Sequence, residues 1–225
     1  GPAVPRASIT CAAPGGSWSS TSTWTGGVVP TSADDVTITS GCSVTIDTAA
    51  TALNVTVANG GTLQYEDTTA RSLTVGANVS VDTGGVFQTA ATGTQTGHTL
   101  SVGGNLVNLG TVDFSTNSDT AGASITFTDA SNATLSNSGT LDLRTVTLNK
   151  GTTSSSVLDF LPGGTVTVQG ANTAGFLTIT NGTFKISGSG ALTNPVLATA
   201  GYTIPATGGL WLNDANATVV GQNGS

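Results

Sequence analysis

The stretch Gly139-Thr140-Leu141-Asp142-Leu143 joins a turn-forming glycine to a short strand in which apolar and polar residues alternate. The same pattern, Gly-Thr-apolar-x-apolar, recurs at 61–65, 110–114, 164–168 and 182–186, and copies without the threonine occur at 84–88 and 208–212. Six steps from Gly61 to Gly209 cover 148 residues, which gives a mean period of about 25. Periods of roughly 20 to 50 residues are typical of solenoids. The repeat therefore predicts stacked coils that each begin with a glycine-led strand.

Further short alternating strands lie between these copies, for example at 73–75, 100–102 and 145–148. Two or three strands per period, separated by Gly, Asn, Asp and Ser turns, are typical of a coil with two or three faces. We therefore predict an all-β, right-handed parallel β-helix with almost no α-helix. An antiparallel β-sandwich is the alternative, since it also contains many short strands, but Asn-Gly hairpin turns between matched strands are scarce here.

Residues 1–35 differ from the rest because they are rich in proline and contain two of the three tryptophans. A solenoid exposes an open end unless something covers its first coil. We expect residues 1–35 to form an N-terminal cap in which Trp18 and Trp24 close the lumen. Residues 36–225 are expected to form the β-helix, as a segment of a longer protein.

The chain has two cysteines, Cys11 and Cys42, and one histidine, His98. An even cysteine count in a chain of low charge fits one disulfide formed in an oxidising compartment, and two buried reduced thiols are the alternative. His98, between Gly97 and Thr99, is expected in a solvated turn. We predict no metal site and no cofactor, although a structural calcium ion held by paired aspartates is left open.

Charged residues make up 8% of the sequence, against roughly 25% in ordinary globular domains. The net charge is −7, and the five basic residues are scattered along the chain. Nucleic-acid binding would need a clustered basic face, so no nucleic-acid partner is expected. No apolar run approaches the roughly 20 residues that span a bilayer, so no membrane span is expected either.

The start of the chain contains a distinctive series of residues. Trp18 is followed by Trp24-Thr25-Gly26-Gly27-Val28-Val29-Pro30, and then by Asp34-Asp35-Val36-Thr37-Ile38, Gly41 and Val44-Thr45-Ile46-Asp47. This opening resembles that of G8-type domains and of similar β-helical repeat proteins on bacterial surfaces. The resemblance implies a glycine-rich, β-rich domain located outside the cell or at its surface. Some such domains are attached to hyaluronan-degrading or adhesive proteins, but no catalytic motif of those enzymes follows in this chain.

If the glycine-led strands stack in register, their central positions form an outward column with about 4.8 Å between neighbours. Amides, carboxylates, a lysine and an indole are groups that bind sugar hydroxyls and stack on pyranose rings. A solvated face without a ligand is the alternative. We therefore predict a glycan-binding surface made of Gln64, Gln88, Asp113, Asp142, Thr167, Lys185 and Trp211.

These features favour a non-catalytic segment of an extracellular surface adhesin, a rigid β-helical stalk that binds a polysaccharide or a cell-surface glycan. The alternative is a carbohydrate-active β-helix enzyme, a polysaccharide lyase or glycoside hydrolase, acting through Asp113 and Asp142 with Arg144 or Lys150. A further alternative is an ice-binding solenoid. Thr-x-Thr pairs begin at Thr37, Thr126, Thr145, Thr165 and Thr178, but their offsets do not follow the period of about 25, so no flat threonine array is predicted.

Overall fold

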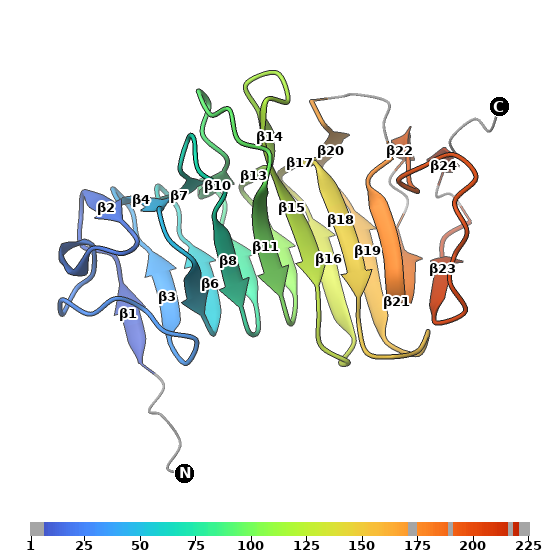
Figure 1. The fold of residues 1–225 in the computed structure, drawn as a ribbon, viewed down its shortest axis with the longest axis horizontal. Helices are drawn as coiled ribbons and strands as arrows, with labels where there is room; N and C mark the ends of the chain where they lie inside the picture. Colours follow the sequence, from blue (N-terminus) through green and yellow to red (C-terminus); the bar gives the residue numbers. More distant parts are fainter. Residues whose placement is uncertain (1–6, 171–174, 189–190, 216–217, 221–225) are drawn as a thin grey trace, which may run out of the picture.

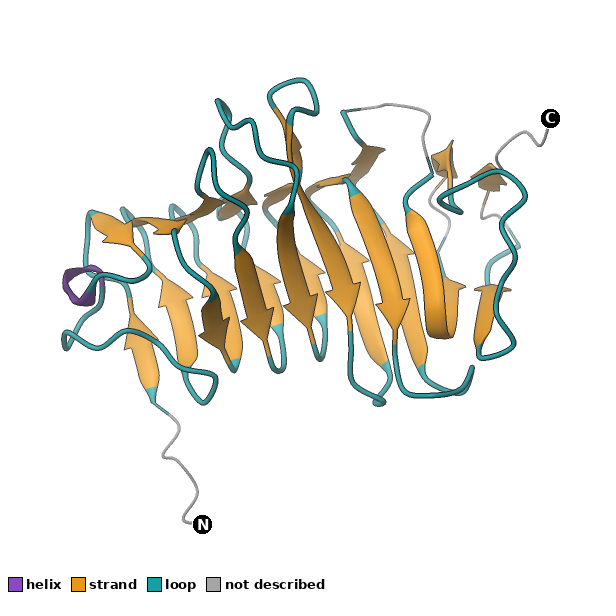
Figure 2. Cartoon of the chain, in the orientation of Figure 1, coloured by secondary structure: helices purple, strands orange, loops and turns teal. Residues whose placement is uncertain are grey.

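The computed structural model describes residues 7–170, 175–188, 191–215 and 218–220. In this part of the chain, strands of successive coils pair in parallel and stack along one axis (Figure 1). Strands and loops dominate, and η1 (Thr21–Thr23) is the one helical turn of the described residues (Figure 2). Among the described strand pairs, only β14 (Ser115–Thr116) with β15 (Ala121–Phe127) is antiparallel. The predicted all-β parallel β-helix is confirmed, and the antiparallel sandwich is wrong.

Three faces run along the stack, which we call the back, upper and front sheets after their places in Figure 1. The back sheet contains β1 (Ser8–Thr10), β3 (Asp35–Ile38), β6 (Asn54–Val57), β9 (Val79–Val81), β12 (Leu106–Asn108), β16 (Ala133–Asn137), β19 (Val157–Pro162), part of β21 (Leu177–Ile186) and β23 (Gly208–Leu212). The upper sheet contains β2 (Gly15–Ser17), β4 (Ser43–Ile46), β7 (Thr62–Tyr65), β10 (Val86–Gln88), β13 (Thr111–Asp113), β17 (Thr140–Leu143) and β20 (Thr165–Val168). The front sheet contains β5 (Ala50–Ala52), β8 (Ser72–Val75), β11 (His98–Val102), β15, β18 (Thr145–Asn149) and the other part of β21.

Strand β21 joins two of these faces. Its first half pairs with β18 of the front sheet, and its second half pairs with β19 and β23 of the back sheet. Because β21 is continuous, the front and back sheets form one hydrogen-bonded sheet of 15 strands. Beyond the upper sheet, β22 (Ala191–Pro195) pairs in parallel with β24 (Thr218–Val220).

The core is a column of apolar side chains inside the coils. Alternate residues of each strand point inward, as the period of two requires. In the upper sheet, Leu63, Phe87, Val112 and Leu141 are aligned by register from coil to coil and are fully buried. Burying one such side chain contributes about 1.5–3 kcal/mol, so every coil adds to the stability of its neighbours.

The glycines that start the upper strands lie where the backbones of neighbouring coils approach closely. The Thr140 amide donates to the Gly110 carbonyl over 2.9 Å, and the Thr165 amide donates to the Gly139 carbonyl over 2.9 Å. A Cβ added to Gly139 would lie 2.0 Å from the Gly110 oxygen. The glycine of the repeat is therefore required by this close approach, which explains why it recurs in each coil.

Two asparagines support the same corner from inside. Asn108 Nδ2 donates to Asn137 Oδ1 over 2.7 Å and to the Thr140 carbonyl over 2.7 Å. Asn137 Nδ2 in turn contacts the carbonyl oxygens of Gly139, Gly163 and Thr165 at 2.6–3.2 Å. Both side chains are buried, so these bonds satisfy turn carbonyls that water does not reach.

A second set of asparagines follows the corner between the front and back sheets. In each case the side-chain oxygen accepts a hydrogen bond from a backbone amide of the next coil. The backbone amides of Asn78, Asn105, Thr134 and Val157 donate to the side-chain oxygens of Asn54, Asn78, Asn105 and Asn132, in that order.

The N-terminal segment is part of the stack, because β1 pairs with β3 and β2 pairs with β4. Trp18 and Trp24 are buried in the core, with ring centroids 5.0 Å apart, and Trp24 Nε1 donates to the Trp18 carbonyl. Cys11 and Cys42 form the predicted disulfide, with Cα atoms 6.4 Å apart. The two tryptophans are therefore part of the core, and the cap formed by residues 1–35 stays a prediction.

Candidate functional site

Five residues of the predicted column lie together on the upper sheet. Register aligns Gln64 with Gln88, Gln88 with Asp113, Asp113 with Asp142, and Asp142 with Thr167. Gln88 Nε2 donates to Gln64 Oε1 over 2.9 Å, so these two amides form a ladder along the stack. Their binding role stays a prediction, but their alignment is as expected.

Lys185 and Trp211 do not continue this column, and that part of the prediction is wrong. Lys185 pairs in register with Asp159 on one side and Trp211 on the other, in the back sheet. The glycines that precede them, Gly182 and Gly208, start segments of the back sheet, whereas the earlier glycines of the repeat start strands of the upper sheet. A glycine marks a corner in either case, so the motif alone does not show which face follows.

The two aspartates of the upper sheet are neighbours with partly satisfied carboxylates. Asp142 is buried, and both of its oxygens accept from the Gly170 amide, at 3.2 and 3.0 Å. Asp113 Oδ1 accepts from the Ser115 amide over 3.2 Å. Burial raises the pKa of Asp113. Burial also raises the pKa of Asp142; hydrogen bonds from Thr167 and Gly170 oppose this, and the charges of Asp113 and Asp119 add to it.

Removing one of these charges is expected to stabilise the protein at neutral pH. A carboxyl whose pKa is raised by folding contributes stability while it is protonated and loses it as the pH rises through the folded pKa. We therefore expect Asp142→Asn to be more stable than the wild type at pH 7, by up to about 1 kcal/mol. The difference in the free energy of unfolding between Asp142→Asn and the wild type should vanish below pH 3.8, the ordinary pKa of an aspartate carboxyl in the unfolded chain. Chemical unfolding between about pH 3.5 and pH 8 measures it.

Asp129→Asn is the control for this prediction. Hydrogen bonds from Ser131 lower the pKa of Asp129, so removal of this charge should have the opposite sign and destabilise the protein at pH 7. Asparagine also tolerates the backbone φ of 63° at this position. A wild-type protein that gains stability over Asp142→Asn between pH 4 and pH 7 would contradict the pKa direction of Asp142.

The basic residues expected near the acids have other partners. The Arg144 guanidinium forms an ion pair with Asp119 and donates to the Asp119 carbonyl over 3.1 Å. Asp119 belongs to the turn between β14 and β15, where residues 117–119 all have positive φ. Lys150 follows the front strand β18, is fully buried, and donates to the Thr128 carbonyl over 2.7 Å. Arg144 is therefore already paired with Asp119, and Lys150 is buried and bonded to a backbone carbonyl.

A second group of polar residues surrounds Trp211 on the back sheet. The indole is 48% exposed, and Lys185 Nζ lies 4.7 Å from its ring centroid. Lys185 Nζ also forms an ion pair of 2.8 Å with Asp159 Oδ2, which fixes the ammonium group over the ring. The hollow next to this trio is lined by Asn105, Asn132, Ala133, Thr134, Val157, Asp159, Lys185 and Trp211.

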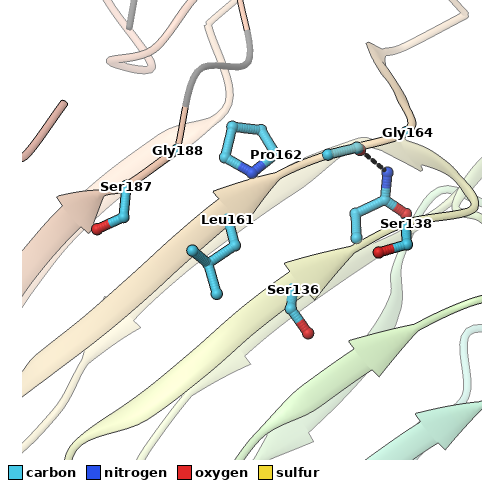
Figure 3. Close-up of a pocket in the computed structure, with 9 residues that line it drawn as sticks. Ser136, Ser138, Leu161, Pro162, Gly164, Ser187 and Gly188 are labelled. Carbon is cyan, nitrogen blue, oxygen red and sulfur yellow. Dashed lines mark hydrogen bonds between the residues drawn. The ribbon is translucent and has the colours of Figure 1, made fainter. Parts of the chain in front are cut away.

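Another hollow lies at the corner between the back and upper sheets. Figure 3 shows Ser136, Leu161 and Pro162 on adjacent strands of this hollow, with Ser187 beyond them. The dashed line is the hydrogen bond from Asn137 Nδ2 to the Gly163 carbonyl. The labelled side chains carry no charge and no aromatic ring, so this hollow offers few groups that could orient a ligand.

The sequence pattern predicts His98 in a solvated turn, and this is wrong. His98 is the first residue of β11, is 1% exposed, and its ring stacks on Tyr65 with centroids 4.8 Å apart. Its Nδ1 accepts from the Arg71 amide, and burial lowers its pKa. The alternation with the buried Leu100 and Val102 was the signal for an inward position.

An array of hydroxyl groups on the front sheet was not predicted from the sequence. Register aligns one outward residue from each front strand, and we call this set the threonine column: Thr51, Thr74, Ser101, Thr126, Thr147 and Thr178. Three of the Thr-x-Thr pairs contribute to this column, while Thr37 lies on the back sheet and Thr165 on the upper sheet. The usable signal was the triplet apolar-Thr/Ser-apolar, as in Leu73-Thr74-Val75 and Leu100-Ser101-Val102.

The described residues contain no group of three or more His, Cys, Asp or Glu side chains that could hold a metal ion. Over the same described residues, none of the helical structure has the length and apolar character needed to cross a membrane.

Comparison with known proteins gives one match. The model of a family described as the G8 domain matches residues 23–180, whereas neither curated proteins nor solved structures yield a match. The matched region includes most of the opening that resembles G8-type domains and continues through the coils into β21. Lys185 and Trp211 lie beyond it. Because the match covers more than half of the 225 residues, the chain belongs to the G8 domain family.

Proposed function

We propose that this chain is a non-catalytic part of an extracellular surface adhesin, a rigid β-helical stalk that binds a glycan in the hollow beside Trp211. The observation that carries the proposal is the half-exposed indole of Trp211, held under Lys185 next to a row of polar side chains. The disulfide fits an oxidising compartment, in agreement with a location outside the cell.

The chemistry of the hollow suits a sugar ring. An indole face stacks on the apolar face of a pyranose, and the amides of Asn105 and Asn132 can exchange hydrogen bonds with hydroxyl groups at its edge. Lys185 and Asp159 carry opposite charges that neutralise each other. The pair therefore favours a neutral or weakly acidic glycan over a highly charged one.

The rest of the fold supports the stalk part of the proposal. The apolar core is continuous from Ile9 to Val196, and the asparagine sets tie several successive coils together. Because each coil contacts only its neighbours, such a fold can be lengthened along its axis by the addition of further coils of the same kind. Such a scaffold holds the Trp211 hollow on a stiff, weakly charged rod.

Glycan-array binding tests the proposal. We expect the wild type to retain at least one glycan and Trp211→Ala to weaken that binding by about five- to tenfold, since stacking on an aromatic ring contributes on the order of 1–1.5 kcal/mol. Leu212→Ala is the matched control, because Leu212 is the next residue of β23, is 52% exposed and does not line the hollow. Absence of any bound glycan, or equal losses in both variants, would reject the glycan part and leave a stalk.

The enzyme alternative is less well supported. It needs Asp113 and Asp142 beside a cation that is free to act on a substrate. Arg144 is paired with Asp119, and Lys150 is buried at a different corner. Incubation of retained glycans with the protein should therefore release no shortened or unsaturated products, and release of such products would favour the alternative.

A further inference from the structure

The front sheet presents an uncharged face of hydroxyl groups. Figure 1 shows β8, β11, β15, β18 and β21 side by side, and the threonine column runs across them in register. A second, shorter row lies two residues earlier along each strand and consists of Ser72, Thr99, Ser124 and Thr145. None of these ten positions carries a charge or an aromatic ring.

The threonine column is free of internal hydrogen bonds. In the described part of the chain, no protein group bonds to the hydroxyls of its six members, although Thr145 and Ser124 of the second row bond to each other over 2.7 Å. The outward rows of the other faces are less uniform. On the back sheet Thr10, Thr37, Thr56 and Ser80 also align, but this row continues through Val107, Ser136 and Leu161. Gln88 bonds to Gln64, and Lys185 is paired with Asp159. The column hydroxyls therefore remain available to solvent or to a ligand along the whole face.

The spacing of these hydroxyls is regular in two directions. Neighbouring members of one row are about 4.8 Å apart, and the two rows are separated by two residues of a strand, roughly 6.6 Å. The asparagine sets and the core hold the strands in register, so the spacing is built into the fold before any ligand binds. A preorganised array fits a ligand that is itself a rigid lattice.

We propose that the threonine column is an ice-binding surface, whose ligand is the ordered water at the surface of an ice crystal. Each threonine offers a hydroxyl that bonds to water and a methyl group that water does not solvate well. A repeated pair of such groups, in two rows with spacings comparable to those between oxygen atoms of ice, holds water in lattice positions. A glycan is a weaker match for this face, because it lacks an aromatic platform. The proposal is independent of the Trp211 hollow, which lies on the opposite face.

Ice-binding assays on matched variants test this inference. Wild-type protein should shape growing ice crystals, show thermal hysteresis and become enriched in ice grown slowly from dilute solution. Thr126→Tyr should lose most of this activity, since a bulky ring in the centre of the column separates the face from the lattice. Thr74→Tyr, at the exposed position of β8, should do the same.

Thr56→Tyr is the control, because Thr56 occupies the equivalent outward position between Thr37 and Ser80 on the back sheet. It should keep the wild-type activity, as should Trp211→Ala. Circular dichroism and melting curves check that all variants are folded. A wild type that neither shapes ice nor enters it overturns the proposal, and so do equal losses in Thr126→Tyr and Thr56→Tyr. Loss of glycan retention in Thr126→Tyr with no ice activity in the wild type would assign the face to a glycan instead.

Discussion

Gly139→Ala is expected to destabilise the fold by about 4 kcal/mol or more, a loss that few small domains can absorb. The added Cβ would lie 2.0 Å from the Gly110 oxygen, whereas real Cβ atoms essentially never lie closer than 3.0 Å to such an atom. Relief of this clash requires two coils to separate at the corner. The separation would break the bonds from Thr140 to Gly110 and from Thr165 to Gly139.

Gly76→Ala is the matched control for this variant. Gly76 also has a φ outside the left-handed region, but a Cβ there would meet only the tip of Leu53, at 3.6 Å, and the Ala52 oxygen, at 3.9 Å. Alanine at Gly76 should therefore be neutral or slightly stabilising. Melting temperature and yield of soluble protein measure both variants. If Gly139→Ala melts as the wild type does, the close packing of coils at this corner does not require glycine.

Asn137→Ala is expected to cost about 3 kcal/mol or more, because each buried polar group left without a partner costs about 1–3 kcal/mol. The change removes the donor to the carbonyls of Gly139, Gly163 and Thr165 and the acceptor for Asn108. Asn137→Asp is a more severe test, because it keeps the volume but replaces the donor with a second acceptor and a charge.

The exposed asparagines of the opposite corner provide the comparison. Asn132→Ala removes one bond, from the Val157 amide, at a position where water can replace the lost acceptor. Its cost should stay near about 1 kcal/mol or below. Denaturant unfolding with a constant m-value separates the two effects. Similar losses in Asn137→Ala and Asn132→Ala would show that burial of the inner asparagines does not set their contribution.

The coils could be predicted because the backbones of neighbouring coils approach closely at the same corner again and again. Each of these close approaches leaves room only for a glycine. Gly85, Gly110 and Gly139 all start upper strands at the same corner, and their spacing gave the period. The motif fails at Gly182, where the chain passes from the front to the back sheet inside β21 without a separate loop. The pattern therefore places Lys185 and Trp211 on the wrong face, although it pairs them correctly with each other.

The threonine column could not be found from residue spacing because the coils differ in length. Thr126 and Thr147 are 21 residues apart, whereas Thr147 and Thr178 are 31 apart, yet both pairs are direct neighbours in the sheet. Loops such as the turn between β14 and β15 absorb these differences without disturbing register. Alignment by strand pattern, not by a constant offset, recovers the column.

The burial of two polar residues, Lys150 and His98, could not be predicted from the sequence either. Lys150 belongs only to the enzyme alternative and His98 is predicted in a solvated turn, because residues of these types are rarely fully buried. Both lie inside the solenoid, where a backbone carbonyl or amide supplies a partner. Which polar residue turns inward depends on the local corner geometry, and a sequence without its register does not contain that information.

The disulfide between Cys11 and Cys42 also determines how the rod would respond to mechanical tension. Parallel strands stacked along one axis can be peeled from an end one coil at a time, since each coil is held by its neighbours alone. A pulling force on the N-terminus would be transmitted from Cys11 to Cys42 through the disulfide. The chain between the two cysteines, which are 31 positions apart in the sequence, would not carry this force. The first coil is thereby locked, and peeling from this end has to begin in the coils that follow it.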